Sequence, residues 1–333
     1  MSTISVVITT HNRPHLLPRA IESARLAGAA VEVVVVDDAS GDETAEVCRN
    51  LSGIRYVRVE RNQQVAGARN IGILNSTGEY IAFLDDDDVR LAGSLDLQVA
   101  ALDSSPDAGL IYGQALVRDD RINVNESQRL EPDDFYPAHC PHGDVFWELL
   151  EQNFIPCGAT VFRRSCLFRI GLLDQSVPGI DDWDLWIRIA ALYPVIVLPQ
   201  PVVVWRKSSP LSGQGTSAVD EIAAMSTRCM KRKWLKLPQA TSVLASKRRD
   251  VWRRFSNQLV SQLAVETISA LRHRHYAAAR RNLLATIRLH PRASVRLVTS
   301  SSAIRHLRGW AKDDRQQDAL RISQTQQANG SAD

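Results

Sequence analysis

Cysteine is scarce in this chain, and no hydrophobic run is long enough to cross a bilayer. The five cysteines among 333 residues are odd in number and irregularly spaced, which does not suggest a disulfide framework. The chain enters a predicted strand almost at once, without a basic segment and a long apolar core, so we expect no signal peptide. These absences favour a protein of the reducing cytoplasm.

Aromatic residues are also few, at 6% of the chain. Because single-stranded nucleic acids bind by stacking on aromatic side chains, and no nucleic-acid-binding motif is present, we predict no nucleic-acid partner. The net charge of +3 conceals an asymmetry. Residues 218–333 carry a net charge of +14, whereas residues 1–217 carry −11. An acidic front suits metal binding, and a basic tail suits a membrane surface, an anionic acceptor or another protein.

Strand and helix signals alternate through the first half of the chain, which is typical of a parallel sheet covered by helices. The predicted strands are residues 4–9, 31–36, 54–59, 80–84 and 109–113, and the predicted helices are about 14–27, 42–51, 65–75 and 91–103. Later signals indicate strands at 159–162, 195–198 and 202–205 and a helix over 183–192. A polar stretch over 118–143 is interpreted as a surface segment over the site.

The chain changes character after residue 217. A stretch rich in Ser and Gly, residues 208–217, is interpreted as a hinge loop, and helical periodicity follows at 250–271 and 276–289. We therefore predict an α/β domain over residues 1–217, a basic helical extension over 218–312 and a disordered tail over 313–333.

Clustered carboxylates follow two of the predicted strands. They are Asp37 and Asp38 after residues 31–36, and Asp85, Asp86, Asp87 and Asp88 after residues 80–84. Because the carboxyl ends of parallel strands lie at one sheet edge, we expect these side chains to meet there. Carboxylates so close raise one another's pKa unless a cation such as Mg²⁺ or Mn²⁺ neutralises them. The alternative for either acidic run alone is a solvated loop or a helix cap.

Five motifs occur in order along the chain: Ser5 to Arg13, Val36 to Ser40, Gly67 to Gly72, Phe83 to Asp88 and Asp181 to Trp186. Together they resemble glycosyltransferase family 2 over roughly residues 3–206. The resemblance implies the GT-A fold, which is Rossmann-like with a mostly parallel sheet and helices on both faces, followed here by the helical extension. It also implies inverting transfer from a nucleotide-diphospho-sugar donor with Mn²⁺ or Mg²⁺ as cofactor.

The resemblance places the donor site in about residues 1–115 and the acceptor site in about residues 116–217. The donor-binding residues that it implies are Thr10, Asn12, Arg13, Asp37, Asp38, Gly67, Arg69, Asp85 and Asp86. Asp37, with Asp38, would accept hydrogen bonds from the base or the ribose, and Arg69 would lie near the base and phosphates. The alternative for residues 38–42 is a turn and helix cap.

Asp85 and Asp87 match the first and third positions of the DxD motif. By the resemblance Asp87 is the direct metal ligand, Asp85 lies near the ribose and the ion, and Asp88 is an outer residue or a cap. The family often has a histidine ligand after the last strand, and this chain has none there. Lys207 is an alternative contact for the diphosphate, which would weaken the requirement for metal.

Asp181 and Asp182 match a family Glu-Asp pair whose second member is the general base. Asp182 would therefore deprotonate the acceptor hydroxyl. Because Asp181 stands where Glu is usual, it stays open which carboxylate reaches the acceptor, and a helix N-terminus rich in acids is the alternative. Trp183 is expected to face an acceptor sugar, and Trp186 to pack in the core.

The sequence thus predicts a cytoplasmic, metal-dependent inverting glycosyltransferase. Its donor is expected to be a UDP-sugar, and its acceptor a hydroxyl of a cell-surface glycan or a lipid-linked molecule. Residues 218–312 are expected to contact an anionic membrane peripherally, and an oligomer or a partner-binding role for them stays open. The alternatives are a sugar nucleotidyltransferase, whose Gly-rich basic signature is missing after the first strand, and a non-catalytic nucleotide-sugar-binding or scaffold protein.

Overall fold

The computed structural model describes residues 3–118, 134–206 and 218–289. The chain divides into two compact units, one of residues 1–218 and 225–251 and the other of residues 219–224 and 252–333. Part of the expected basic extension, residues 225–251, therefore packs with the unit that holds the sheet. The predicted hinge at 208–217, the tail at 313–333 and most of the polar segment at 118–143 lie outside the described residues.

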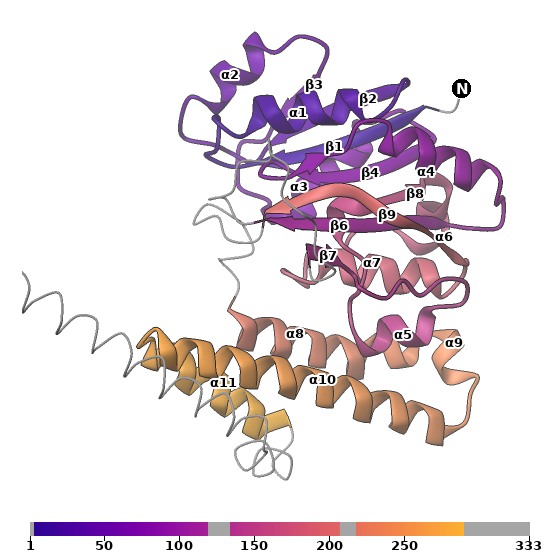
Figure 1. Ribbon diagram of the computed structural model, residues 1–333, viewed down its shortest axis with the longest axis vertical. Coiled ribbons are helices and arrows are strands. Elements are labelled where there is room, and N and C mark those ends of the chain that lie inside the picture. The colour runs from indigo at the N-terminus through magenta and orange to yellow at the C-terminus, as the bar shows by residue number, and fades with distance from the viewer. Residues whose placement is uncertain (1–2, 119–133, 207–217, 290–333) are drawn as a thin grey trace, which may run out of the picture. The chain divides into compact units, whose positions relative to one another are not determined.

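The strands of the first unit form one sheet (Figure 1). They are β1 (Ile4–Thr10), β2 (Val31–Asp37), β3 (Arg55–Arg58), β4 (Tyr80–Asp85), β5 (Val89–Arg90), β6 (Leu110–Arg118), β7 (Phe135–Tyr136), β8 (Thr160–Arg163) and β9 (Val195–Arg206). Their order is β3-β2-β1-β4-β8-β6-β9-β5, with β7 paired to β6. The first four are parallel, as predicted, but β8 runs antiparallel to both β4 and β6, so the sheet is mixed in its second half.

The helices are α1 (Leu17–Leu26), α2 (Thr44–Asn50), α3 (Gln64–Leu74), α4 (Ser94–Asp103), α5 (Phe146–Glu151), α6 (Leu167–Ile170), α7 (Asp181–Ala190), α8 (Val219–Arg232), α9 (Pro238–Thr241), α10 (Ala245–Arg272) and α11 (Tyr276–Leu289). Most of them begin and end close to the predicted limits, but α5, α6, α8 and α9 have no predicted counterpart. Helix α1 begins three residues after the predicted start at Pro14, because a turn precedes it. Helix α7 begins at Asp181, so both acids of the predicted catalytic pair lie in its first turn.

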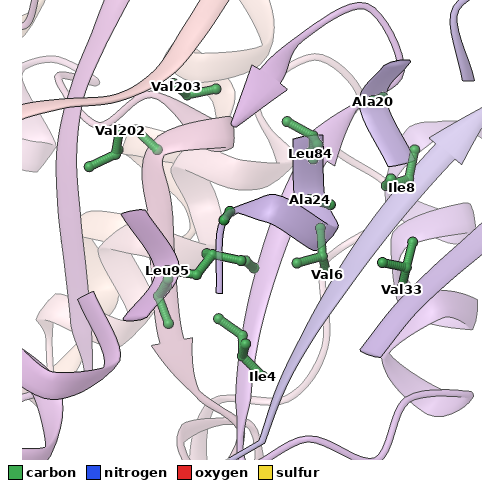
Figure 2. Close-up of a cluster of buried hydrophobic side chains, with 14 of the residues drawn as sticks. Ile4, Val6, Ile8, Ala20, Ala24, Val33, Leu84, Leu95, Val202 and Val203 are labelled. Atoms are coloured by element: carbon green, nitrogen blue, oxygen red, sulfur yellow. The ribbon is translucent and has the colours of Figure 1, made fainter. Parts of the chain in front are cut away.

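The sheet carries helices on both faces because its central strands are apolar on both sides. Alternate β1 residues, Ile4, Val6 and Ile8, pack in one cluster with Ala20 and Ala24 of α1 (Figure 2). On the other face, Val34 and Val36 of β2 pack against Ala68 of α3. Trp186 of α7 lies against Phe83 of β4 and Phe162 of β8, which confirms the expected core position of its ring.

The predicted strands at 195–198 and 202–205 are one continuous strand, β9. Prolines occupy positions 199 and 201 between the two predicted segments, and proline cannot donate a hydrogen bond to a sheet. The strand accommodates both prolines because its register against β6 is irregular there: Leu198 lies opposite Gly113, and Pro201 lies opposite Gln114. The strand thus continues to Arg206, at the edge of the sheet that bears the acidic residues.

The second unit is helical. Residues 219–224 of α8 contact α11 through an ion pair of Asp220 with Arg281, 3.6 Å apart, and Phe255 and Leu263 of α10 are fully buried. Among the residues that the structure describes, no helix is both long and apolar enough to span a bilayer.

Gly72 of α3 provides a stability test, because a Cβ atom there would lie 2.2 Å from Cγ1 of Val7 in β1. We expect Gly72→Ala to lower the free energy of unfolding by about 1–3 kcal/mol, since helix and strand would have to separate. Gly41→Ala is the matched control, because a Cβ atom at position 41 meets nothing within 4 Å. Denaturant titration measures both, and equal stability of the two variants would contradict the close packing of α3 on β1.

Candidate active site

The ends of three adjacent parallel strands bring the predicted site residues together. Thr10, the last residue of β1, pairs with Asp37 at the end of β2, and Thr9 pairs with Asp85 at the end of β4. The register therefore places the two acidic runs on one edge of the sheet, as the sequence predicts.

Asp86 contacts two of the residues expected around the nucleoside. The Thr10 hydroxyl donates to one carboxylate oxygen of Asp86 at 2.7 Å, and Nη1 of Arg13 donates to the other at 2.9 Å. Arg13 also lies 3.8 Å from a carboxylate oxygen of Asp87. The loop after β1 is thus joined to the loop after β4 by charge-assisted hydrogen bonds.

Asp37 is fully buried, and protein donors engage both of its carboxylate oxygens. The Tyr56 hydroxyl donates to one at 2.7 Å, and the Ser40 amide donates to the other at 2.9 Å. Burial raises the pKa of the neighbouring Asp38, whose carboxylate accepts a hydrogen bond from the Gln63 amide. Backbone amides thus bond to both of the carboxylates that are predicted to bind the base or the ribose, as in a turn. The contact of Tyr56 with Asp37 has no local signal in the sequence.

Asn12 connects the loop after β1 to the loop after β2. Its backbone has a positive φ of 56°, which asparagine tolerates better than most residues. Its side-chain oxygen accepts a hydrogen bond from the Gly41 amide at 2.7 Å, and its own amide donates to the Ser40 hydroxyl at 2.9 Å. Asn12 therefore shapes the edge where we expect the nucleoside.

Arg69 links the predicted donor residues to the predicted base. It extends from α3, its side chain is 6% exposed, and its guanidinium stands 5.2 Å from the centre of the Phe83 ring. Nη2 donates to Asp85 at 2.8 Å and Nη1 donates to Asp181 at 3.0 Å. One guanidinium therefore fixes the end of β4 against the start of α7.

Gly67 lies two residues before Arg69 in the first turns of α3. A Cβ atom there would lie 2.7 Å from Cβ of Gln63 and 3.5 Å from Cδ of Gln175. A side chain at position 67 would thus crowd Gln63 just before α3, whereas its contact with Gln175 would be an ordinary van der Waals contact. The expected donor contact of Gly67 stays a prediction.

Three carboxylates converge at the end of β4. Oxygens of Asp85, Asp87 and Asp88 lie within 4.8 Å of one another, the one such group of acids, histidines and cysteines among the described residues. Burial and the charges of Asp85 and Asp86 raise the pKa of Asp87 to about 7. Burial and the charges of Asp85, Asp87 and Asp86 raise the pKa of Asp88. This set of hard, mutually repelling oxygens fits Mg²⁺ or Mn²⁺. The sequence placed Asp88 outside the direct ligands.

Asp88 meets the end of β9, because one of its oxygens accepts a hydrogen bond from the Arg206 amide at 3.0 Å. The family often has a histidine metal ligand directly after this strand, and this chain has none there. Lys207, the alternative contact for a diphosphate, lies outside the described residues. Asp88 thus stands where β9 approaches the acidic cluster.

Asp182 is partly buried in the first turn of α7, next to Asp181. Burial raises the pKa of Asp182, and the negative charge of Asp181 raises it further. A carboxylate with a raised pKa is a better proton acceptor than an ordinary one, as a general base requires. Trp183 does not face the site as expected: it is 6% exposed, and its indole N–H donates to the Leu149 carbonyl at 2.7 Å.

Sequence comparison places this site in a known family. Residues 5–169 match the profile of glycosyl transferase family 2. An uncharacterized glycosyltransferase of Rickettsia felis is 29% identical over 194 residues, which cover 56% of this chain and 30% of that relative. One from Bacillus subtilis is 27% identical over 219 residues, which cover 65% of this chain and 77% of the relative. The chain thus spans about a third of the first curated relatives that it matches.

Solved structures share the fold. S. aureus TarS in complex with UDP-GlcNAc aligns with a TM-score of 0.58 and 14% identity, over 94% of this chain and 92% of that one. The mannosyltransferase PcManGT from Pyrobaculum calidifontis, in complex with GDP-Man and Mn²⁺, aligns with a TM-score of 0.55 and 20% identity, over 86% of each chain. The GT-A fold implied by the resemblance is thereby confirmed. Residues 5–169 of the chain thus form a glycosyltransferase family 2 domain.

Proposed function

We propose that the protein transfers a sugar from a nucleotide-diphospho-sugar to an acceptor hydroxyl, with inversion at the anomeric carbon. The observation that carries the proposal is the bridge made by Arg69, which joins Asp85 of the donor edge to Asp181 beside the expected base. Donor and base residues from distant parts of the sequence are thus held at one site. The family supports the reaction class, and the residues at the site suit its chemistry.

The donor is proposed to lie along the edge formed by β1, β2 and β4. Thr10, Asn12, Arg13 and Asp37 would surround the nucleoside, and the guanidinium groups of Arg13 and Arg69 would approach its phosphates. S. aureus TarS is described with UDP-GlcNAc and PcManGT with GDP-Man, so the two nucleotides to test first are UDP and GDP. We favour UDP, as the sequence resemblance suggests.

Asp85, Asp87 and Asp88 are proposed to hold a divalent cation. A bound Mn²⁺ or Mg²⁺ would stabilise the negative charge that develops on the departing diphosphate. Asp88 would supply a third carboxylate in a chain that has no histidine directly after β9. Asp86, whose oxygens are engaged by Thr10 and Arg13, would orient the donor loop instead.

Asp182 is proposed to accept the proton of the acceptor hydroxyl as its oxygen attacks the anomeric carbon. The bond between that carbon and the diphosphate oxygen breaks in the same step, through a transition state with oxocarbenium character. The ion pair of Asp181 with Arg69 would fix the first turn of α7. The acceptor is proposed to be a cell-surface glycan or lipid-linked molecule.

Two other functions are less consistent with the site. A sugar nucleotidyltransferase would not need a base at the start of α7. A non-catalytic binding protein would need the donor edge but neither the ion pair of Arg69 with Asp181 nor the raised pKa of Asp182.

Asp182→Asn tests the proposed chemistry. We expect kcat for sugar release from UDP-GlcNAc or GDP-Man to fall by about 10²–10⁴-fold, because an amide cannot accept the proton, while nucleotide affinity stays unchanged. Asp181→Asn is the comparison, since a larger loss of kcat in that variant would assign the base to Asp181. Turnover equal to wild type in both variants would contradict a carboxylate base at α7.

Metal binding should depend on pH, because Asp87 must lose its proton to act as a ligand. Its pKa is raised to about 7, so protons compete with the cation below that pH. We expect the dissociation constant for Mn²⁺ to be about tenfold higher near pH 6 than near pH 8. Calorimetric titration measures this, with Asp87→Asn as the variant that loses binding and Asp107→Asn as an exposed control. A constant affinity over this range would contradict the assignment of Asp87.

We also propose that the second unit contacts an anionic membrane. On α11, Arg280, Leu283, Leu284, Ile287 and Arg288 share one helical face by their spacing, and all five are exposed. Ala279, Asn282 and Thr286 are buried on the opposite side. An exposed apolar stripe flanked by arginines suits the boundary between headgroups and acyl chains.

Vesicle sedimentation tests this contact. The full chain should bind vesicles rich in phosphatidylglycerol and not pure phosphatidylcholine vesicles, and added salt should weaken the binding. The double variant Arg280→Glu, Arg288→Glu should lose more than about tenfold in affinity, because two attractive charges become repulsive. Arg49→Glu, at an exposed position of α2, is the control. Wild-type binding by the double variant would contradict the proposed surface.

A further inference from the structure

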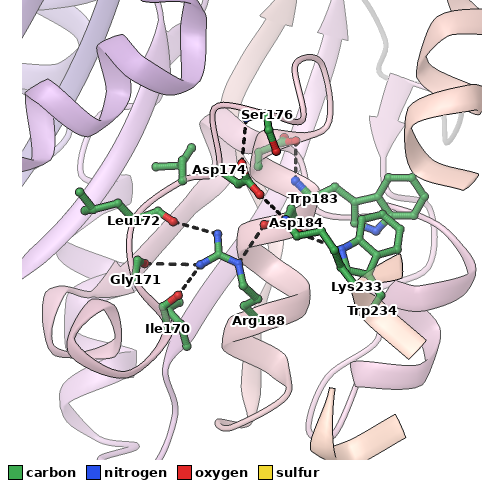
Figure 3. A network of polar contacts seen from close by, with 12 residues as sticks. Ile170, Gly171, Leu172, Asp174, Ser176, Trp183, Asp184, Arg188, Lys233 and Trp234 are labelled. Atoms are coloured by element: carbon green, nitrogen blue, oxygen red, sulfur yellow. Dashed lines mark hydrogen bonds and ion pairs between the residues drawn. The ribbon is translucent and has the colours of Figure 1, made fainter. Parts of the chain in front are cut away.

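Asp184 follows the expected base by two residues, and its carboxylate is 1% exposed. Nε of Arg188 donates to one of its oxygens at 2.9 Å. The other oxygen accepts a hydrogen bond from the Trp234 indole at 2.8 Å and lies 3.6 Å from the Lys233 ammonium (Figure 3). Two of these three partners, Lys233 and Trp234, come from the segment just after α8, which lies beyond the last strand in the sequence.

The loop before α7 is held by the same groups. Arg188 donates to the Ile170 carbonyl at 2.6 Å and to the Leu172 carbonyl at 3.0 Å, and Lys233 forms an ion pair with Asp174 (Figure 3). Asp174 in turn accepts a hydrogen bond from the Ser176 amide at 2.8 Å. The loop that delivers the acid pair is thus fixed by side chains of α7 and of the segment after α8.

Helix α3 holds this loop from another side. The Asn70 side chain donates to the Leu173 carbonyl and accepts from the Leu173 amide, both at 2.9 Å. Asn70 is the neighbour of Arg69, which pairs with Asp181. Contacts from α3 therefore fix both the loop and the first residue of α7.

We propose that Lys233 and Trp234 are positioning residues for the base at Asp182. Lys233 forms ion pairs with Asp174 in the loop before α7 and with Asp184 in α7. It therefore connects the two segments on either side of Asp182. Trp234 donates to Asp184, and its ring lies 5.0 Å from that of Trp183, the residue next to the base. Residues beyond the matched family region, 5–169, thus help to build the active site.

The charges of this cluster explain why a lysine is needed. Asp174 and Asp184 bring two negative charges to the junction, and Arg188 and Lys233 bring two positive ones. Without Lys233, the buried negative charge of Asp184 would lose one of its two positive partners, and Asp174 would lose its ion-pair partner. Because an uncompensated buried charge is unfavourable, we expect the loop to shift. Small displacements of a base lower turnover more than they lower donor binding, since the donor contacts lie on the β1, β2 and β4 edge.

This inference rests on the proposed function, and its first test does not need activity. We expect Lys233→Ala to speed hydrogen exchange of the backbone amides between Leu173 and Asp184, with no change at β1 and β2. Lys236→Ala, an exposed lysine three residues later, is the matched control. Unchanged exchange over residues 173–184 in Lys233→Ala would overturn the inference even if no turnover were found.

Kinetics provide the second test. In Lys233→Ala, kcat should fall by about tenfold or more while the nucleotide dissociation constant stays within about twofold of wild type. Lys233→Arg should recover part of kcat, because a guanidinium can also pair with both carboxylates. Asp174→Ala combined with Lys233→Ala should cost no more than the worse single variant, if the two residues act as a pair. Full turnover of Lys233→Ala would overturn the inference, whereas inactive wild-type protein would instead contradict the proposed function.

Discussion

Repulsion between carboxylates is the constraint on which the rest of the site depends. Four aspartates at the end of β4 and two at the start of α7 meet on one side of the sheet, and most of them are buried. Arg13 and Arg69 each pair with two of these acids, which leaves an excess of negative charge. Burial, together with that excess, raises the pKa of Asp87 and Asp182. The same excess of negative charge suits both a divalent cation and a general base.

The sequence predicted the features that follow from strand ends. Alternating strands and helices placed the acids after β2 and β4 at one edge, and the parallel register of β1, β2 and β4 confirms this. The family resemblance also assigned Arg69 and the acid pair to one active site, and in the structure Arg69 bonds to Asp85 and Asp181. The roles of these residues stay predictions. The strand-end acids are accessible from the sequence because they depend on local pattern and on a common rule of α/β sheets, whereas the assignment of Arg69 and the acid pair depends on the resemblance.

Features that depend on contacts between distant segments escaped prediction. Tyr56 reaches Asp37, Asp88 meets the end of β9, and Lys233 with Trp234 holds the loop before α7. None of these pairs shares a periodicity or a spacing that the sequence could reveal. The prediction that Trp183 faces an acceptor sugar was wrong for the same reason, since only the fold shows that its indole N–H donates to the Leu149 carbonyl. The antiparallel β8 likewise requires knowledge of the whole sheet.

On the proposed function, a nucleotide diphosphate binds at the edge of β1, β2 and β4 together with a divalent cation held by the aspartates after β4. Calorimetric titration of the full chain with UDP and with GDP, each with and without Mn²⁺, is the measurement to make first. We expect one of the two nucleotides to bind, Mn²⁺ to strengthen its binding, and Asp87→Asn to remove the effect of the metal. Binding of neither nucleotide, or equal binding with and without Mn²⁺, would refute a metal-assisted donor site at this edge.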